Sequence, residues 1–404
     1  MIESILRIVA LIALLGCITS CFYFLFCIWN AIVFMRQARA GSASARAAKD
    51  FPPVSVLKPL KGPDPEIYES FRSHCMQDYP KYELIFGVSD PADPAVKMVE
   101  RLQAEFPSHA IHLLICRERL GPNVKVSNLE QMTRIARYDH LIVNDSDIRV
   151  EPDYIHRVVS PLTGQRVGLV TCLYRGVAAR TLGSRLESLG ISTDFCPGVL
   201  VARQLQGGLN FGLGSTLSFR RSELEQIGGF RSIVDSLADD YELGHRISDL
   251  GRLVQLSEVV VETHLPAYDF AGFLAHQLRW ARGVRDARFG GYLGLIFTFG
   301  LLWAAIAVTI AHAALWAWGV FFLVVGLRFA AAIAVGKGVL RDNQLIPNLW
   351  LLPVRDLIAV AVWITSFAGH TVTWRGDSFL LKRGKLVPRV SHTEMSETTR
   401  TRKD

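Results

Sequence analysis

The sequence predicts an α/β fold, in which a mostly parallel sheet carries helices between its strands and membrane helices flank the sheet domain. Two observations support this prediction. Short apolar runs of strand length alternate with helical stretches between residues 51 and 143, the order expected of βαβ units. Long runs without a charged residue lie near both ends of the 404-residue chain, and half of all residues are hydrophobic.

Four strands and three helices are predicted in the first part of the central region. The apolar runs are residues 54–57, 84–88, 111–115 and 141–143, and the helical stretches are residues 66–77, 95–106 and 127–137. Neither G-x-G-x-x-G nor G-x-x-x-x-G-K-[ST] follows any of these strands, which disfavours a dinucleotide or P-loop site. The seven cysteines form no paired C-x-x-C pattern, and no basic run is interleaved with aromatic residues. Zinc binding, a disulfide framework and nucleic-acid binding are therefore not expected.

Two long apolar runs predict membrane helices. Residues 8–35 are 28 positions without a charge, and residues 289–327 are 39 more. About 20 apolar residues cross a bilayer. We therefore expect an uncleaved anchor helix in the first run and a hairpin turning near His312 in the second, with its second helix continuing past Arg328. Residues 357–374 form a weaker stretch that is either a further span or a re-entrant or interfacial segment.

Basic residues predict which side of the membrane the central domain occupies. Arg7 precedes the first apolar run, whereas Arg36, Arg39, Arg46 and Lys49 follow it, which places the central domain in the cytoplasm. Two later spans would keep the basic tail on that side, whereas three would put it outside, against the same rule. The count of two is favoured.

Two carboxylates one residue apart follow the fourth apolar run, in Asn144-Asp145-Ser146-Asp147. Residues i and i+2 of a strand point the same way, so Asp145 and Asp147 can converge on one hard cation, Mg²⁺ or Mn²⁺. Open α/β sheets bind ligands at the carboxyl ends of their strands. The alternative is that the pair caps a helix or forms an Asx-turn.

Other acids lie in comparable places. Asp90 comes just after the second apolar run, where it can accept hydrogen bonds from a base or ribose, or else serve as a cap or turn residue before Pro91. Asp239 and Asp240 precede a helical pattern at residues 241–250. One of them is a candidate general base, and stabilisation of the helix dipole is the alternative.

A basic and aromatic motif, His276-Gln277-Leu278-Arg279-Trp280-Ala281-Arg282, precedes the second long apolar run. Arg279 and Arg282 are three residues apart and share a helix face. A planar guanidinium suits the neutralisation of a leaving phosphate. Alternatively, these arginines fix the membrane topology or contact lipid headgroups.

In order along the chain, Asp90, Asp145-Ser146-Asp147, Asp239-Asp240 and His276-x-x-Arg279-Trp280 resemble the D, D-x-D, [ED]-D and [QR]-x-x-R-W motifs of family 2-like membrane glycosyltransferases. The sequence is most similar to family 21, the ceramide glucosyltransferase family, and to its bacterial branch that includes the hopanoid-biosynthesis glycosyltransferases. The resemblance covers residues 51–290 and the membrane segments. It implies a GT-A fold and a multi-pass protein of the bacterial inner membrane with its catalytic domain on the cytoplasmic face.

The resemblance also implies a role for each matched residue. Asp90 would contact the uridine of a UDP-sugar, Asp145 and Asp147 would hold the cation and the diphosphate, and Asp240 would take the proton of the acceptor hydroxyl. Arg279 and Trp280 would contact the diphosphate or close over the donor. The other expected site residues are Asp239 in the catalytic acid pair and, around the substrates, Lys58, Lys125, Asn128, His276 and Arg282.

We therefore expect an inverting hexosyltransferase that moves glucose or N-acetylglucosamine from a UDP-sugar to a lipid hydroxyl at the membrane. Residues 192–197 contain Asp194 and no histidine, whereas family members that act on ceramide often carry a histidine there, which raises a different lipid alcohol as acceptor. Transfer of N-acetylglucosamine to bacteriohopanetetrol is the main alternative. A processive polysaccharide synthase and a non-catalytic membrane protein that binds lipid or nucleotide are the other two.

The expected domain boundaries follow from these segments. Residues 1–50 form the anchor and a linker, residues 51–268 the catalytic domain, and residues 269–290 an interfacial segment with the basic and aromatic motif. Residues 291–390 form a transmembrane or re-entrant region, and the polar residues 391–404 a disordered tail.

Overall fold

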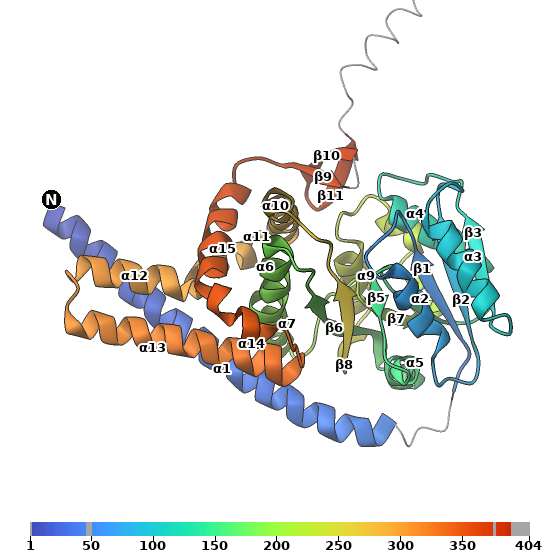
Figure 1. Cartoon of the computed structure of the whole chain (residues 1–404), viewed down its shortest axis with the longest axis horizontal. Helices are drawn as coiled ribbons and strands as arrows, with labels where there is room; N and C mark the ends of the chain where they lie inside the picture. The colour runs from blue at the N-terminus through green and yellow to red at the C-terminus, as the bar shows by residue number, and fades with distance from the viewer. Residues whose placement is uncertain (1, 46–50, 375–376, 389–404) are drawn as a thin grey trace, which may run out of the picture.

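The computed structural model describes residues 2–45, 51–374 and 377–388. An eight-stranded sheet with its helices forms one side of the molecule, the long apolar helices form the other, and a small three-stranded sheet lies at the edge of the larger sheet domain (Figure 1). The α/β fold class predicted from the sequence is confirmed.

The eight-stranded sheet has the order β3-β2-β1-β4-β7-β6-β8-β5. Its strands are β1 Val54–Pro59, β2 Tyr82–Val88, β3 Ile111–Ile115, β4 His140–Val143, β5 Ile148–Arg149, β6 Val167–Val177, β7 Leu217–Arg220 and β8 Leu253–His264. The pairs β1–β2, β1–β4, β2–β3 and β6–β8 are parallel, whereas β7 runs antiparallel to β4 and β6. The four predicted strands are confirmed, and together they place the carboxyl ends of β1, β2 and β4 at one edge of the sheet.

Helices cover both faces of the sheet. They are α2 Ile67–Cys75, α3 Ala95–Glu105, α4 Val124–Ile135, α5 Tyr154–Val159, α6 Leu182–Gly190, α7 Cys196–Leu205, α8 Arg221–Gln226 and α9 Asp239–Asp249. The three predicted helical stretches correspond to α2, α3 and α4. Helix α4 begins three residues earlier than predicted because Asn123 caps it, accepting a hydrogen bond from the Val126 N–H at 3.1 Å.

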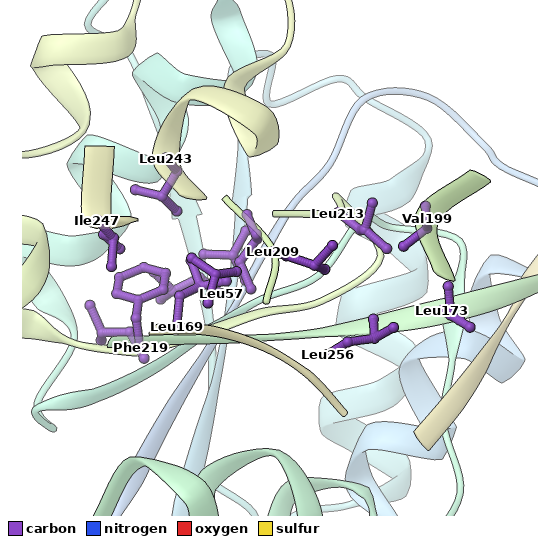
Figure 2. Close-up of a cluster of buried hydrophobic side chains, with 14 of the residues drawn as sticks. Leu57, Leu169, Leu173, Val199, Leu209, Leu213, Phe219, Leu243, Ile247 and Leu256 are labelled. Carbon is purple, nitrogen blue, oxygen red and sulfur yellow. The ribbon is translucent and has the colours of Figure 1, made fainter. Parts of the chain in front are cut away.

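Alternate residues of the strands pack into two separate hydrophobic cores. One core contains Leu57 of β1, Phe219 of β7, Leu243 and Ile247 of α9 and Val199 of α7 (Figure 2). The other contains the opposite face of β1 and β2 together with α2, α3 and α5. The first core extends to Ala31 and Phe34 of the anchor helix α1 (Ile2–Ala45). The anchor is therefore packed against the catalytic domain and does more than tether it.

The membrane helices form a bundle around α1. Helices α12 (Gly300–Ile310) and α13 (Leu315–Ala332) lie beside the first half of α1 (Figure 1). They form the predicted hairpin, whose turn contains His312 and Ala313 with positive φ. By length and composition three described helices can cross a membrane, or up to four if a pair bent by 49°, Phe289–Thr298 and Gly300–Ile310, is counted as one span.

The remaining helices and turns connect the bundle to the sheet domain. Helices α10 (Phe270–Ala287) and α15 (Leu352–Ser366) run across the direction of α1, α12 and α13 (Figure 1). The short elements are α11 Phe289–Gly294, α14 Leu345–Asn348, π-helical segments at Ile191–Phe195 and Ile333–Val339, and 3₁₀ turns at Ser160–Thr163, Phe230–Ile233, Leu295–Thr298 and Leu349–Leu351.

The sequence analysis did not foresee the small C-terminal sheet. Its strands are β9 Thr371–Trp374, β10 Asp377–Lys382 and β11 Lys385–Pro388, all within the region that was expected to be transmembrane or re-entrant. The sheet packs on the catalytic domain, since the Leu386 N–H donates to the Asp235 carbonyl at 2.7 Å and the Leu237 N–H to the Gly384 carbonyl at 3.1 Å. If the apolar helices cross a membrane, an even number of crossings separates the two. The linker residues 46–50 and the tail 391–404 lie outside the described residues.

Candidate functional site

The site begins at the turn that follows β4. The strand ends at Val143, and residues 145–147 form a turn closed by the Ile148 N–H, which donates to the Asp145 carbonyl at 3.3 Å. The expectation that Asp145 and Asp147 project from the strand itself is therefore wrong. The turn nevertheless places both carboxylates at the carboxyl edge of the sheet, where their negative charges act on one another.

Lys58 holds this acidic turn through hydrogen bonds to its backbone. The residue is fully buried at the end of β1, and its Nζ donates to the carbonyls of Asp145 at 2.9 Å and Ile148 at 3.4 Å. Burial lowers the pKa of Lys58 to about 7, against the opposing attraction of Asp147 and Asp145. Lys58 therefore holds the backbone of the turn in place.

Lys125, near the start of α4, joins two of the acids. Its Nζ lies 2.8 Å from Asp145 Oδ1 and 3.0 Å from Asp239 Oδ2. Burial alone lowers the pKa of Lys125, but the carboxylates of Asp145, Asp239 and Asp240 outweigh burial and raise it. The ammonium group therefore stays charged and links the turn after β4 to the start of α9.

Asp240 lies in the first turn of α9. Its Oδ2 accepts a hydrogen bond from the Gly214 N–H at 2.7 Å, and its Oδ1 accepts one from the Tyr241 N–H at 2.8 Å. Burial, together with Asp239, raises the pKa of Asp240 to about 6, although Lys125 opposes the shift. The group is thus a stronger base than an ordinary aspartate and is still ionised at neutral pH, as a general base requires.

Asp147 is the more deeply buried acid of the turn. Burial raises its pKa to about 6, with the neighbouring charge of Asp145 adding to the effect, and the Thr263 hydroxyl at the end of β8 donates to its Oδ2. By contrast, the Asp145 side chain is 41 % exposed. The turn therefore offers one accessible and one enclosed carboxylate.

The described residues contain no group of three or more His, Cys, Asp or Glu side chains arranged to hold a metal ion. Two carboxylates at one turn still fit a cation that takes its other ligands from a bound diphosphate. Their oxygen atoms are the ligands that Mg²⁺ and Mn²⁺ prefer, and Mg²⁺ is commonly held by one or two carboxylates and substrate phosphates. The exposure of Asp145 gives such a cation access.

A small cavity of about 30 Å³ opens beside the turn. It is lined by Pro59, Leu60, Lys61, Pro122, Val124, Lys125, Asn128, Asp145, Ser146 and Phe379. The cavity thus brings together three residues predicted from the sequence, Lys125, Asn128 and Asp145. Asn128 accepts a hydrogen bond from the Ser89 hydroxyl at 2.9 Å, which fixes the orientation of its amide.

Four of the predicted substrate residues, Lys58, Asp90, His276 and Arg282, are not among the described residues that line this cavity. Asp90 follows β2 at the same edge, but it is exposed and its Oδ1 accepts from the Ala92 N–H at 2.8 Å, as in an Asx-turn. Arg282 donates to the carbonyls of Thr371 at 2.6 Å and Ala368 at 3.0 Å, so it holds the segment that leads into β9.

The other residues of the basic and aromatic motif lie on α10. His276 is stacked between Tyr268 and Trp280, with ring centroids 5.4 and 5.3 Å away. Its Nδ1 lies 3.2 Å from Oε1 of the buried Glu187, and Trp280 packs against Phe195 at 5.8 Å. The motif therefore builds an aromatic wall between the acids and the membrane helices.

Arg279 lies within electrostatic range of Tyr268. Burial raises the pKa of Tyr268 to about 12; Glu187 and Asp147 add to this shift, and Arg279 opposes it. Tyr268 therefore lies within electrostatic range of both α10 and the acidic turn, and Arg279 brings a positive charge to the same side of the site.

Three residues that contribute to the site were not predicted from the sequence. Gly214 lies in a loop where only its backbone acts, Thr263 is hidden in a strand, and Phe379 belongs to the unforeseen C-terminal sheet. A signal existed only for Gly214, in the glycine-rich segment Gly212-Leu213-Gly214. Thr263 and Phe379 have no local pattern that marks them.

Comparison with known proteins gives one family. The family model for glycosyl transferase family 21 matches residues 12–387. Ceramide glucosyltransferase 3 of Caenorhabditis elegans is 24 % identical over 403 residues, which cover 95 % of this chain and 84 % of that protein. A ceramide glucosyltransferase of Komagataella phaffii is 34 % identical over 113 residues, or 27 % of this chain and 22 % of that protein.

Among solved structures, the mannosyltransferase PcManGT of Pyrobaculum calidifontis, in complex with GDP-Man and Mn²⁺, is similar with a TM-score of 0.49. It is 19 % identical in sequence, and the match covers 88 % of this chain and 98 % of that one.

Proposed function

This chain belongs to glycosyl transferase family 21, and on that premise we propose that it transfers glucose or N-acetylglucosamine from a UDP-sugar to the hydroxyl group of a membrane lipid. Its central domain has the GT-A fold, and the protein is a hexosyltransferase. One observation carries the proposal. Asp145, Lys125 and Asp240, from three separate elements, meet at the edge of the sheet that binds ligands.

Asp240 is the general base of the proposed reaction. The lipid hydroxyl oxygen forms a bond to the anomeric carbon while the bond from that carbon to the UDP oxygen breaks, and the hydroxyl proton passes to the Asp240 carboxylate. Hydrogen bonds from the Gly214 and Tyr241 N–H groups orient the carboxylate and leave lone pairs on both of its oxygens. Direct attack on one face of the sugar inverts the anomeric configuration.

Positive charge is needed on the opposite side, where UDP departs. Arg279 on α10, whose charge acts on Tyr268, and Lys125 at the cavity would supply it. Asp145 and Asp147 would hold a divalent cation, which when bound supplies further charge for the diphosphate. Asp90 and Asn128 would bind the nucleoside part of the donor, as their positions after β2 and on α4 support.

The membrane helices give the acceptor its place. A lipid hydroxyl stays at the bilayer surface, and α10, which carries His276 and Trp280, lies between the sheet domain and the helices α12 and α13 (Figure 1). Arg36 and Arg39 follow the apolar part of α1, which supports a cytoplasmic catalytic domain. The even number of crossings demanded by the C-terminal sheet agrees with the single hairpin favoured by the sequence.

The names of the relatives support glucose as the sugar and ceramide as the acceptor. A different lipid alcohol is supported by residues 192–197, which contain Asp194 and no histidine, where family members that act on ceramide often carry one. Bacteriohopanetetrol with N-acetylglucosamine is that alternative.

A screen of sugar donors and lipid acceptors distinguishes between these sugar–lipid pairs. Membranes containing the protein are incubated with UDP-glucose or UDP-N-acetylglucosamine and with ceramide or a polyol lipid, and mass spectrometry reports the added mass. One sugar on one lipid supports the proposal and identifies the pair. A long polymer would indicate a processive synthase instead. If no glycolipid forms with any of the donors, the proposal is rejected.

A further inference from the structure

The C-terminal sheet contributes a side chain to the cavity beside the acidic turn. Phe379 of β10 lines that cavity together with Lys125 and Asp145. The ring is 3 % exposed and packs in a small core with Val372, Leu381 and Leu386 of the same sheet, against Leu237. A segment that follows the last membrane helix in the chain thus reaches the catalytic centre.

The sheet is attached on two sides. Backbone hydrogen bonds join β11 and its turn to residues 235–237, which directly precede Asp239 and Asp240. On the other side, Arg282 and Arg285 of α10 hold the carbonyls of residues 368–371, where Arg285 Nη2 donates to Gly369 at 3.1 Å. The sheet therefore connects the helix that carries the basic and aromatic motif to the loop that presents the catalytic acids.

The lining of the cavity has two chemically different parts. Its apolar residues are Pro59, Leu60, Pro122, Val124 and Phe379, and its polar ones are Lys61, Lys125, Asn128, Asp145 and Ser146. Apolar rings and side chains suit the flat faces of a nucleobase, because every base has a π-face on which an aromatic ring can stack. The polar part, next to the acidic turn, suits the ribose and the diphosphate.

We propose that Phe379 packs against the base of the nucleotide donor and that the C-terminal sheet is a movable wall of the donor site. This inference rests on the proposed function, because it takes the cavity as the place of a UDP-sugar. It adds a binding residue that no motif of the family 2-like series contains.

The small size of the cavity favours a wall that moves when a nucleotide binds. A volume of about 30 Å³ holds only a few water molecules, far less than a nucleotide. The opposite walls are β1, α4 and the turn after β4, whose side chains enter the two large cores. The C-terminal sheet has a core of four buried residues of its own and is otherwise held by a few polar contacts with residues 235–237 and α10, so it is the wall that yields at the lowest cost.

Two matched substitutions in β10 test the role of the Phe379 ring. Phe379→Ala and Leu381→Ala both hollow the small core of the sheet, but of these two residues it is Phe379 that lines the cavity. Binding of UDP to the full-length protein in detergent is measured by calorimetry. We expect Phe379→Ala to weaken UDP binding roughly fivefold or more, Phe379→Tyr to restore it and Leu381→Ala to leave it near the wild-type value.

The outcomes separate the inference from the proposed function. Equal affinities in the wild type and Phe379→Ala, or equal losses in the Phe379 and Leu381 variants, would overturn the role of the ring while leaving the proposed function intact. A wild-type protein that binds neither UDP nor a UDP-sugar would reject the proposed function and the inference with it.

A reversible crosslink tests the movement. Ser236 and Lys385 form an antiparallel bridge between the catalytic loop and β11. Cα atoms paired in this way lie about 4.5–5.5 Å apart, within the range of a disulfide. We expect the oxidised Ser236→Cys, Lys385→Cys protein to bind UDP at least about tenfold more weakly than its reduced form, with both single variants unaffected by oxidation. Equal binding in the oxidised and reduced forms would show that this wall does not move.

Discussion

The Gly214 N–H donates to Asp240 Oδ2 at 2.7 Å, and the absence of a side chain at Gly214 allows this contact. A Cβ atom at this glycine would lie 3.2 Å from Asp240 Oδ2 and 2.8 Å from Asp145 Oδ2. The acid proposed to take the proton and the accessible acid of the turn after β4 therefore face the same backbone position. The spacing of the Asp240 and Asp145 carboxylates therefore depends on a glycine at position 214.

We expect Gly214→Ala to lower kcat by roughly 100-fold, because the added methyl group displaces both carboxylates, and small misplacements in an active site carry penalties of that size. Gly198→Ala is the matched control, since it lies on α7 with nothing within 4 Å of the added Cβ. Turnover of both variants is measured with saturating substrates. Gly214→Ala with wild-type turnover would remove the argument that spacing of the two acids matters.

Asp240→Asn should reduce transfer about 100- to 10,000-fold and leave UDP binding largely unchanged, because the amide keeps the shape of the side chain but cannot accept the proton. Asp249→Asn, at the exposed end of the same helix, is the control and should retain full activity. Initial rates and UDP affinity are compared across the three proteins. Retained turnover in Asp240→Asn would reject the assigned base.

The pH profile should show an acidic limb near pH 6. Burial and the charge of Asp239 raise the pKa of Asp240 to about 6, so below that pH the group is protonated and cannot act as a base. We expect kcat/KM to fall about tenfold per pH unit below this point. Asp239→Asn removes a negative neighbour and should move the limb to lower pH. A limb that stays in place would show that another group controls it.

Chelation should abolish transfer, and Mn²⁺ or Mg²⁺ should restore it, if the acidic turn holds a cation with the diphosphate. Asp147→Asn removes one of the two proposed ligands and should raise the metal concentration needed for half-maximal activity. Asp153→Asn, an exposed acid just before α5, should leave that concentration unchanged. Full activity in excess chelator would contradict the metal assignment.

Arg328 should be important for stability. It lies in α13, 9 % exposed, with its Nη2 2.6 Å from both Asp194 Oδ1 and Asp356 Oδ1. Arg328→Met removes the cation that Asp194 and Asp356 share, with Arg355 still 3.3 Å from Asp194 Oδ2, and should destabilise the protein by about 3 kcal/mol. Lys337→Met, an exposed cation in the next segment of the same span, should change stability little. Thermal unfolding in detergent measures both, and equal midpoints would show that the cluster does not stabilise the bundle.

Local sequence patterns were sufficient for much of the fold. The apolar run at residues 141–143 identified β4, and the uncharged run around His312 identified the hairpin, because strand and membrane helices are encoded by hydrophobicity over short distances. The C-terminal sheet was missed because its strands have four to six residues and follow an apolar helix, so hydropathy alone merges them with the membrane region.

Some contacts of the candidate site were likewise predicted from sequence motifs, whereas others were not. Asp145, Lys125, Asn128 and Asp240 were predicted from motifs, and the structure brings them to one edge of the sheet. The function of Arg282 was not readable from its place in the motif, because its partners are the carbonyls of residues 368 and 371, almost ninety positions away. Contacts between such distant residues depend on how the helices pack.

The sequence by itself determined the fold class, the family resemblance, the anchor and hairpin, and the residue types that do the chemistry. The tertiary structure decided which atoms meet: that Lys58 supports the acidic turn, that Gly214 lies against both Asp145 and Asp240, and that Phe379 lines the cavity beside that turn. The physical reason is distance along the chain. Periodicity and motifs record local preferences, whereas a site assembled from β1, α4, α9 and a C-terminal strand exists only after the sheet and the membrane helices have packed together.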